Sequence, residues 1–166
     1  MLRIQPGQRV ADLGTGVGYL TDSLLSCVGP AGGLVLVDPN DRGLEAVRAR
    51  WGSDPRVQIV QASAAHVPMI PDSSMDRVVL SLVLCCMVDK IGALDETWRI
   101  LRPGGLALVS YPERRWRLNP VKRSLRVSPE LWDQLVAVHP WRTMESKKHR
   151  LIRRHVLQKT GIGAEP

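Results

Sequence analysis

Runs of aliphatic residues alternate with helix-period patterns over the first 110 residues of the chain. The apolar runs predict five strands, at residues 9–13, 34–37, 57–60, 77–84 and 106–110. Apolar positions at helical spacing predict three helices between them, over residues 19–28, 41–51 and 91–101. Apolar strands joined by helices are typical of a parallel sheet covered on both faces. The pattern therefore predicts an α/β fold with a doubly wound, mostly parallel sheet.

Beyond the last of these strands the regular pattern fades. A Ser-Pro-Glu sequence at 128–130 is typical of a helix start, because Ser caps the first turn and Pro fits its first position. Residues 147–159 form a basic segment, of which 151–157 suits an edge strand or a helix face equally. We therefore divide the chain into an α/β core, residues 1–111, and a basic C-terminal extension, residues 112–166, that completes the same domain.

The formal net charge of +7 is unevenly distributed along the chain. Residues 1–111 contain 10 Lys and Arg against 11 Asp and Glu, whereas residues 112–166 contain 13 against 5. Basic segments with interleaved tryptophans are typical of nucleic-acid binding, so residues 114–154 are a candidate surface for nucleic acid or for an acidic protein partner. A solvated, Arg-rich surface is the simpler interpretation, and a role at a membrane surface is a third one.

The cysteines, Cys27, Cys85 and Cys86, are odd in number and two are adjacent, so they indicate no disulfide framework. Reduced thiols are typical of the cytoplasm. The N-terminus shows no signal-peptide pattern. The longest nearly apolar run, 78–88, is far shorter than the roughly 20 residues that cross a bilayer. We expect a cytoplasmic protein with no transmembrane segment and no metal site, since neighbouring residues offer no zinc-ligand spacing.

The most specific motif is a glycine-rich loop between the first predicted strand and the first predicted helix. Gly14, Gly16 and Gly18 follow Asp12, and glycines there permit positive φ angles and close approach of a ligand to the backbone. A dinucleotide fingerprint requires Gly-x-Gly-x-x-Gly. Here the spacing is Gly-x-Gly-x-Gly, and Tyr19 stands where the last dinucleotide glycine would be. The spacing therefore argues against a nicotinamide cofactor.

The loop resembles instead the first motif of the class I S-adenosylmethionine-dependent methyltransferases. In that family the loop passes under the cofactor and its acid holds the methionine end, which implies that Asp12 lies near the cofactor's ammonium group. Asp38 ends the second predicted strand, 20 residues after Gly18. A carboxylate there presents two acceptor oxygens to the two hydroxyls of a ribose. Capping of the next helix, before Pro39, is the purely structural alternative.

Later segments resemble the same family in order and spacing, so that the resemblance covers residues 6–111. Residues 61–66 resemble its adenine-contacting loop, although Ser63 stands where the family usually has an acid and would bond the adenine amine less strongly. The strand at 76–84 resembles its fourth strand, which brings Ser81 and Leu82 toward the cofactor.

The resemblance is closest to the small-molecule methyltransferases typified by quinone-biosynthesis enzymes, and it implies S-adenosyl-L-methionine as cofactor. The cofactor-binding residues that it implies are Asp12, Gly14, Thr15, Gly16, Gly18, Tyr19, Asp38, Pro39, Ala62, Ser63, Ala64, Ser81 and Leu82.

We therefore expect an enzyme that transfers a methyl group to an unidentified acceptor, most simply a small molecule. Displacement at a sulfonium depends largely on alignment in a dry site, and it needs a base only where the acceptor loses a proton. The sequence accordingly identifies no catalytic residue, and His66 is interpreted as a polar loop histidine. Cys85 and Cys86 follow the fourth predicted strand, facing the expected acceptor pocket. Packing is their simpler role, and binding of a metal or a thiophilic substrate such as an arsenical is the other.

Two features depart from the family. Its members usually carry one or more helices before the first strand, whereas here that strand begins within ten residues of Met1. Its sheet normally ends in an antiparallel hairpin, whereas residues 112–166 show no clean pair of strands, so we expect a shortened or remodelled hairpin. These departures favour an alternative: a non-catalytic or partner-dependent cofactor-binding subunit that docks RNA or protein through its basic C-terminal third.

Overall fold

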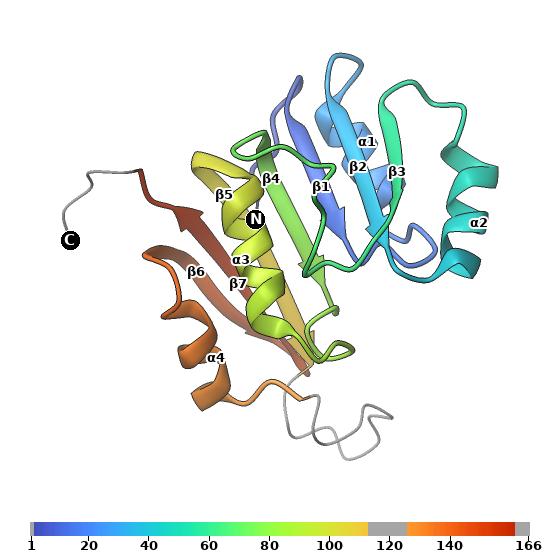
Figure 1. Cartoon of the computed structure of the whole chain (residues 1–166). Coiled ribbons are helices and arrows are strands. Elements are labelled where there is room, and N and C mark those ends of the chain that lie inside the picture. Colours follow the sequence, from blue (N-terminus) through green and yellow to red (C-terminus); the bar gives the residue numbers. More distant parts are fainter. Residues whose placement is uncertain (1, 113–125, 162–166) are drawn as a thin grey trace.

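Seven strands form one sheet with helices on both of its faces (Figure 1). The computed structural model describes residues 2–112 and 126–161. The elements in chain order are β1 (Arg9–Leu13), α1 (Thr21–Val28), β2 (Gly33–Asp38), α2 (Asp41–Trp51), β3 (Val57–Gln61), β4 (Met75–Ser81), α3 (Lys90–Ile100), β5 (Leu101–Pro112), α4 (Pro129–Val136), β6 (Trp141–His149) and β7 (Ile152–Lys159). The predicted α/β fold with a doubly wound, mostly parallel sheet is confirmed.

The strand order β3-β2-β1-β4-β5-β7-β6 sets the position of the functional edge. Strands β1 to β5 pair in parallel, so their carboxyl ends lie along one edge. The chain moves outward from β1 through β2 to β3 and then returns to β4 on the other side of β1. In open α/β sheets, ligands bind beyond the carboxyl ends of the strands where the order reverses in this way. The fold therefore predicts a ligand site at the loops that follow β1 and β4.

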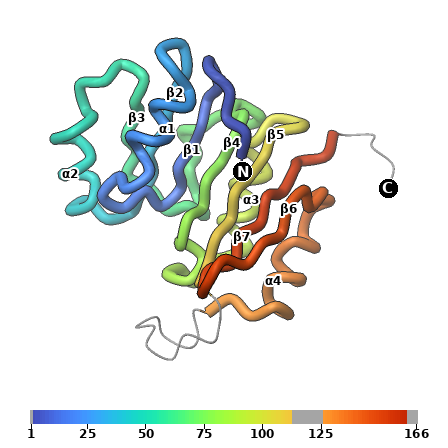
Figure 2. Tube along the Cα trace, turned by 180° about the vertical axis from the view of Figure 1, so that it is seen from behind, coloured from blue at the N-terminus to red at the C-terminus, as the bar shows by residue number. Residues whose placement is uncertain are grey.

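Aliphatic side chains form a separate core on each face of the sheet. On one face α1 and α2 pack over β1 and β2, through Leu24 and Val47 among others. On the opposite face α3 and α4 pack over β4 and β5, through Leu94 and Leu135. Figure 1 shows these last two helices in front of the sheet, and in Figure 2 the strands β5, β7 and β6 lie in front of them. Burial of apolar surface on both faces is the main force that stabilises such a layered fold.

Local chemistry fixes where the helices begin. The Ser128 hydroxyl accepts a hydrogen bond from the amide of Leu131 at 3.2 Å, with Pro129 in the first turn of α4, as the sequence predicted. The Asn40 side chain caps α2 in the same manner. Helix α1 begins at Thr21, two residues later than the pattern indicated, because the glycine loop continues to Gly18, whose φ is 81°.

The expectation of a shortened or remodelled C-terminal hairpin is wrong. Strand β7 pairs antiparallel with β5, and β6 pairs antiparallel with β7 over its whole length, with one irregularity between Thr143 and Glu145. The pattern of apolar and polar residues did not predict the hairpin, because β6 lies at the edge of the sheet and is exposed along most of its length. Charged side chains are common on such edge strands, and they remove the alternation of apolar and polar positions that would reveal a strand.

The hairpin is attached to the rest of the fold by buried side chains of β7. Val156 and Leu157 are buried against the sheet. The Lys159 ammonium donates hydrogen bonds of 2.7 Å to the backbone carbonyls of Trp98 and Leu101, where α3 passes into β5. A cation at the carboxyl end of a helix is favoured there, because the last carbonyls lack partners within the helix.

The face of β5, β7 and β6 that points away from α3 and α4 carries a shallow hollow of about 430 Å³. Its lining combines apolar and charged side chains: Arg3, Leu106, Met144, Glu145, Lys147, Arg154 and Val156. Glu145 pairs with Lys147 at 3.3 Å and with Arg154 at 3.2 Å. Part of the basic charge of the extension is therefore neutralised within the hairpin itself.

Candidate functional site

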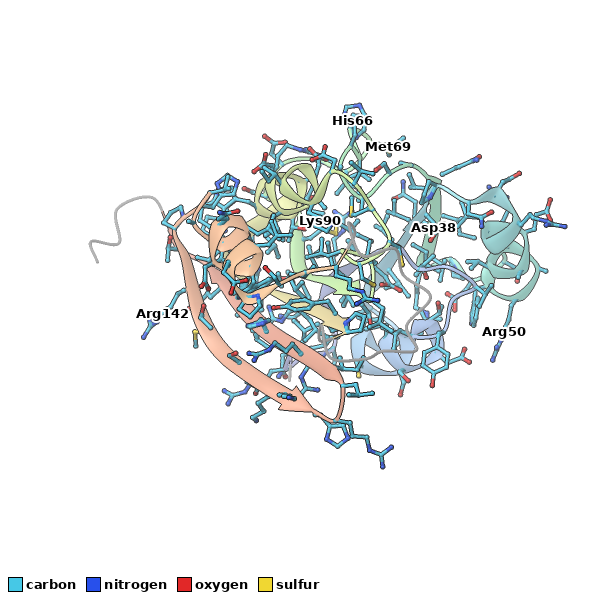
Figure 3. All side chains as sticks on the ribbon, turned by 90° about the horizontal axis from the view of Figure 1, so that it is seen from below. Asp38, Arg50, His66, Met69, Lys90 and Arg142 are labelled. Atoms are coloured by element: carbon cyan, nitrogen blue, oxygen red, sulfur yellow. The ribbon has the colours of Figure 1, made fainter. Side chains whose placement is uncertain are left out.

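A cavity of about 270 Å³ lies at the carboxyl edge of the sheet, between the loops that follow β1, β2, β3 and β4. Figure 3 looks onto this edge, with Asp38 among the loops and His66 projecting outward at the rim. The lining residues are Gly14, Asp38, Pro39, Ser63, Ala64, Leu82, Val83, Cys86 and Met87. Six of the residues that the sequence indicated for cofactor binding are therefore brought together here.

The glycine loop forms one wall of this cavity and needs its glycines for different reasons. Gly14, Gly16 and Gly18 all have positive φ angles, of 83°, 57° and 81°. A Cβ on Gly14 would lie 2.4 Å from Cγ2 of Val83, whereas a Cβ on Gly16 would have no atom within 4 Å. Gly14 is thus required for packing against the loop after β4, and Gly16 leaves open space above the backbone.

Asp38 is held in place by backbone donors. Its Oδ2 accepts a hydrogen bond from the amide of Gly16 at 2.8 Å, and its Oδ1 accepts one from the amide of Asn40 at 2.8 Å. The first of these bonds connects the end of β2 to the glycine loop. A carboxylate has about four acceptor positions, so each oxygen retains capacity for a ligand hydroxyl. Asn40, not Asp38, caps α2, and the two backbone bonds of Asp38 are compatible with a ligand role.

Asp12 occupies a different environment from Asp38. Its side chain is only 2% exposed, beneath the glycine loop, and it does not line the cavity. Burial raises the pKa of Asp12 to about 6, while the neighbouring Thr15 side chain lowers it and the charge of Asp38 raises it further. A carboxyl with this pKa is largely ionised at neutral pH, at an energetic cost that a nearby cation would reduce.

The segment after β3 supplies the opposite wall. Ala64 is buried and Ser63 is exposed at the cavity, where the Ser63 hydroxyl accepts a hydrogen bond from the amide of Ala65 at 3.2 Å. The amide of Ala62 donates to the carbonyl of Asp38 at 3.2 Å and so joins this segment to the end of β2. His66 is exposed, as expected of a polar loop histidine.

The segment after β4 closes the third side. Leu82 has a φ of 61°, an unusual conformation for a bulky residue, and its amide donates to the carbonyl of Ser110 at 2.9 Å. The Ser81 and Ser110 hydroxyls lie 3.2 Å apart. Backbone strain of this kind is frequent where a chain is shaped around a ligand. Leu82 is still 45% exposed, so an apolar side chain is offered to the cavity mouth.

Not every sequence-indicated residue reaches the cavity. Tyr19 is 91% exposed and directed to solvent, and Thr15 is buried under the loop. Val83 and Met87 line the cavity, although the sequence did not indicate them. Cys86 also lines the cavity, although the sequence favoured a packing role for it. Their position just after a parallel strand was the available signal, because that position faces the ligand edge in this class of fold.

The basic extension does not present its tryptophans for base stacking where it is described. Trp132 is buried against Tyr111 and His155, with ring centroids 5.3 Å and 4.0 Å away. Trp141 packs edge-on against Trp98. Residues 113–125, which carry the first basic segments, lie outside the described residues.

No helix within residues 2–112 and 126–161 is both long and apolar enough to cross a membrane. Within the same two ranges, no group of three or more His, Cys, Asp or Glu side chains comes together in a way that would hold a metal ion.

Comparison with known proteins gives matches of two kinds. The family model for the methyltransferase domain matches residues 11–109. The ubiquinone/menaquinone biosynthesis C-methyltransferase UbiE of Ectopseudomonas mendocina is 41% identical over 109 residues, which cover 64% of this chain and 42% of that protein. The UbiE protein of Vibrio cholerae (strain ATCC 39541 / Classical Ogawa 395 / O395) is 39% identical over 108 residues, covering 63% and 41%. The chain thus spans less than half the length of these relatives.

A solved structure gives the same fold at low identity. The S-adenosylmethionine-dependent methyltransferase of Aquifex aeolicus superposes with a TM-score of 0.83 at 15% identity, covering 95% of this chain and 85% of that one. At this identity the likeness concerns the fold alone.

Proposed function

The chain belongs to the class I S-adenosylmethionine-dependent methyltransferases, and from this premise we propose that it transfers the methyl group of S-adenosylmethionine to a small-molecule acceptor. One observation carries the proposal above the others. Gly14, Asp38, Ser63 and Leu82 come from four separate loops, and they meet at one cavity. Each stands in a sequence segment that resembles a motif of the family.

The residues at this edge fit the cofactor chemically. Asp38 would accept the ribose hydroxyls with the lone pairs that its two backbone bonds leave free. The open space above Gly16 would admit the methionine end, and the buried, largely ionised Asp12 would attract its ammonium group. Adenine would lie beside Ser63. The same proposal assigns the remaining contacts to Gly18, Pro39, Ala62, Ala64, Ser81 and Leu82, and leaves out Thr15 and Tyr19, which do not reach the cavity.

The chain's contribution to the reaction is alignment. Bound S-adenosylmethionine supplies a methyl group on a sulfonium, which a nucleophile can displace directly. The protein must hold donor and acceptor in line and exclude water, and the four segments that meet at the cavity are placed for that task. No side chain at the cavity is required as a base unless the acceptor has a proton to lose. We therefore assign no catalytic residue.

The acceptor is best proposed as an apolar small molecule. Leu82 and Met87 line the cavity, and Val17, Val88 and Ile91, on the loops and helix start that follow β1 and β4, are exposed apolar residues at the same edge. The curated relatives are named as C-methyltransferases of ubiquinone and menaquinone biosynthesis, which favours a quinone-type ring as the acceptor class. We extend this acceptor class to the present chain, and we place its activity in the cytoplasm.

Calorimetric titration of the purified chain with S-adenosylhomocysteine, the reaction product, tests the donor site directly. We expect micromolar binding, and no binding of NAD, because the glycine spacing does not fit a dinucleotide. Asp38→Ala should weaken binding by about 1–3 kcal/mol through unpaired ribose hydroxyls. Gly16→Val should abolish binding while circular dichroism shows a folded chain, because its side chain enters open space. Unchanged binding in both variants would overturn the assignment.

A further inference from the structure

The loop after β4 places two thiols in contact beside the proposed donor site. The Sγ atoms of Cys85 and Cys86 lie 3.6 Å apart. Cys86 lines the cavity and Cys85 lies directly behind it, only 3% exposed. Met87, a third sulfur-bearing side chain, lines the same cavity. The mouth of the cavity therefore gathers soft, polarisable donors that the methyl-transfer chemistry does not require.

The backbone holds this pair in a fixed arrangement. Both thiols point at the carbonyl of Leu82, at 3.1 Å for Cys85 and 3.6 Å for Cys86, and the amide of Cys86 donates to the carbonyl of Val83 at 2.8 Å. The Lys90 ammonium donates to the carbonyl of Met87 at 2.7 Å and so fixes the end of the turn. A pair set in place by its backbone loses little freedom when one atom bridges it.

We propose that Cys85 and Cys86 form a dithiol site that binds a trivalent, monosubstituted arsenical or a similar thiophilic metalloid compound at the acceptor end of the cavity. This inference rests on the proposed function in one respect, which is the position of the ligand beside the bound methyl donor.

The geometry favours this class of ligand over a metal ion. An atom about 2.3 Å from each of two sulfurs bridges a gap of the observed size. Zinc requires four ligands, and the described residues bring together no group of three or more suitable side chains. A monosubstituted trivalent arsenical needs only two thiolates, since its organic substituent fills the third position. The apolar side chain of Leu82 at the cavity mouth would pack against such a substituent.

The binding step is balanced without an oxidant or a base. An arsenical of the form R–As(OH)₂ reacts with two thiols, two As–S bonds replace two As–O bonds, and each thiol proton leaves on a hydroxide as water. No charge is created, which suits a pair of which one member is buried. Burial raises the pKa of the Cys85 thiol to about 12, and its proton departs with the leaving hydroxide rather than to solvent.

Phenylarsine oxide is the probe, and the complete chain is used after its reductant has been removed. Intact mass spectrometry should show one phenylarsenic group per chain, formed with loss of one water. The adduct should survive excess glutathione and be reversed by dimercaptopropanol. Cys85→Ser and Cys86→Ser should each weaken retention by about 100-fold or more, because a single thiol lacks the second, intramolecular bond. Cys27→Ser, which removes the remaining, exposed thiol, is the matched control and should behave as the parent.

Thermal unfolding distinguishes a preformed site from two cysteines that are merely adjacent in sequence. A ligand that prefers the folded pair raises Tm, whereas equal affinity for the unfolded chain leaves Tm unchanged. We expect a rise for the parent and for Cys27→Ser, and none for Cys85→Ser or Cys86→Ser. Retention of the adduct by Cys85→Ser or Cys86→Ser, or an unchanged Tm in the parent, would overturn the proposal. The donor titration does not depend on these thiols, so failure of one proposal is distinguishable from failure of the other.

Discussion

Strands β1, β2 and β4 are buried along almost their whole length, whereas β6, at the far end of the same sheet, is exposed along most of its own. The two regions also differ in charge, since the C-terminal extension carries the whole excess of basic residues. The two regions therefore have different structural roles. The parallel region packs tightly around the ligand edge, whereas β6 closes the sheet without a fully buried residue. Substitutions should therefore have much larger effects in the first region than in the second.

The largest effect is expected from a matched pair of glycine substitutions in the parallel region. Both Gly14→Ala and Gly16→Ala place a side chain on a residue with positive φ, which costs about 1–2 kcal/mol. Only Gly14→Ala also brings a Cβ to 2.4 Å from Val83, and such a clash adds about 1–3 kcal/mol. Denaturant unfolding should show a larger loss of stability for Gly14→Ala than for Gly16→Ala. Adding Val83→Ala should reduce this difference between the two variants. Equal losses for the two variants would contradict the packing role given to Gly14.

Asp12→Asn should stabilise the parallel region in a pH-dependent way. The folded chain binds the Asp12 proton more tightly than the unfolded chain, because the pKa rises from 3.8 to about 6. Ionised Asp12 therefore lowers the free energy of unfolding by about 3 kcal/mol above pH 6, and this penalty disappears as the pH falls to about 4. Denaturation at pH 8 and pH 4 measures it, with exposed Asp41→Asn as control. A variant no more stable than the parent at pH 8 would refute this account of Asp12.

Lys159→Met tests the attachment of the hairpin. The substitution keeps the length of the side chain but removes two hydrogen bonds of 2.7 Å to the carbonyls of Trp98 and Leu101. We expect a loss of about 2 kcal/mol in the free energy of unfolding, since hydrogen bonds from a charged donor are among the stronger ones. Thermal unfolding and denaturant unfolding should both measure this loss of stability. A loss below the error of measurement would mean that pairing with β5 and the buried Val156 and Leu157 attach β7 without help from Lys159.

The smallest effect is expected from Arg142→Glu on β6. Figure 3 shows Arg142 projecting away from the molecule, and Arg142 and the following Thr143 are exposed. Reversal of an exposed charge away from caps and buried networks changes stability by about 0.5 kcal/mol or less. The same denaturation assay measures it. A loss as large as that of Lys159→Met would show that the hairpin depends on its surface charges, contrary to the comparison drawn here.

The sequence was sufficient where structure is decided locally. The apolar runs predicted the parallel strands, the Ser128 hydroxyl caps its helix, and the glycine loop has the positive φ angles that its composition indicated. Contacts between distant residues could not be predicted in this way. The distance from Gly14 to Val83 and the contact of Asp38 with Gly16 depend on how the strands align, which no short pattern encodes. Strand β6 was missed for a related reason, because its partner rather than its own sequence makes it a strand.

The two ends of the sheet also have a consequence for how the protein behaves at high concentration. An edge strand with unpaired backbone groups is a template on which another chain can add, and aggregation begins at such edges. Here one edge is the five-residue β3, and the other is β6, which carries Arg142, Lys147 and Lys148. A short edge and a charged edge both discourage the addition of a further strand. The basic residues that removed the strand pattern from the sequence of β6 thus also oppose the addition of a neighbouring molecule at this edge.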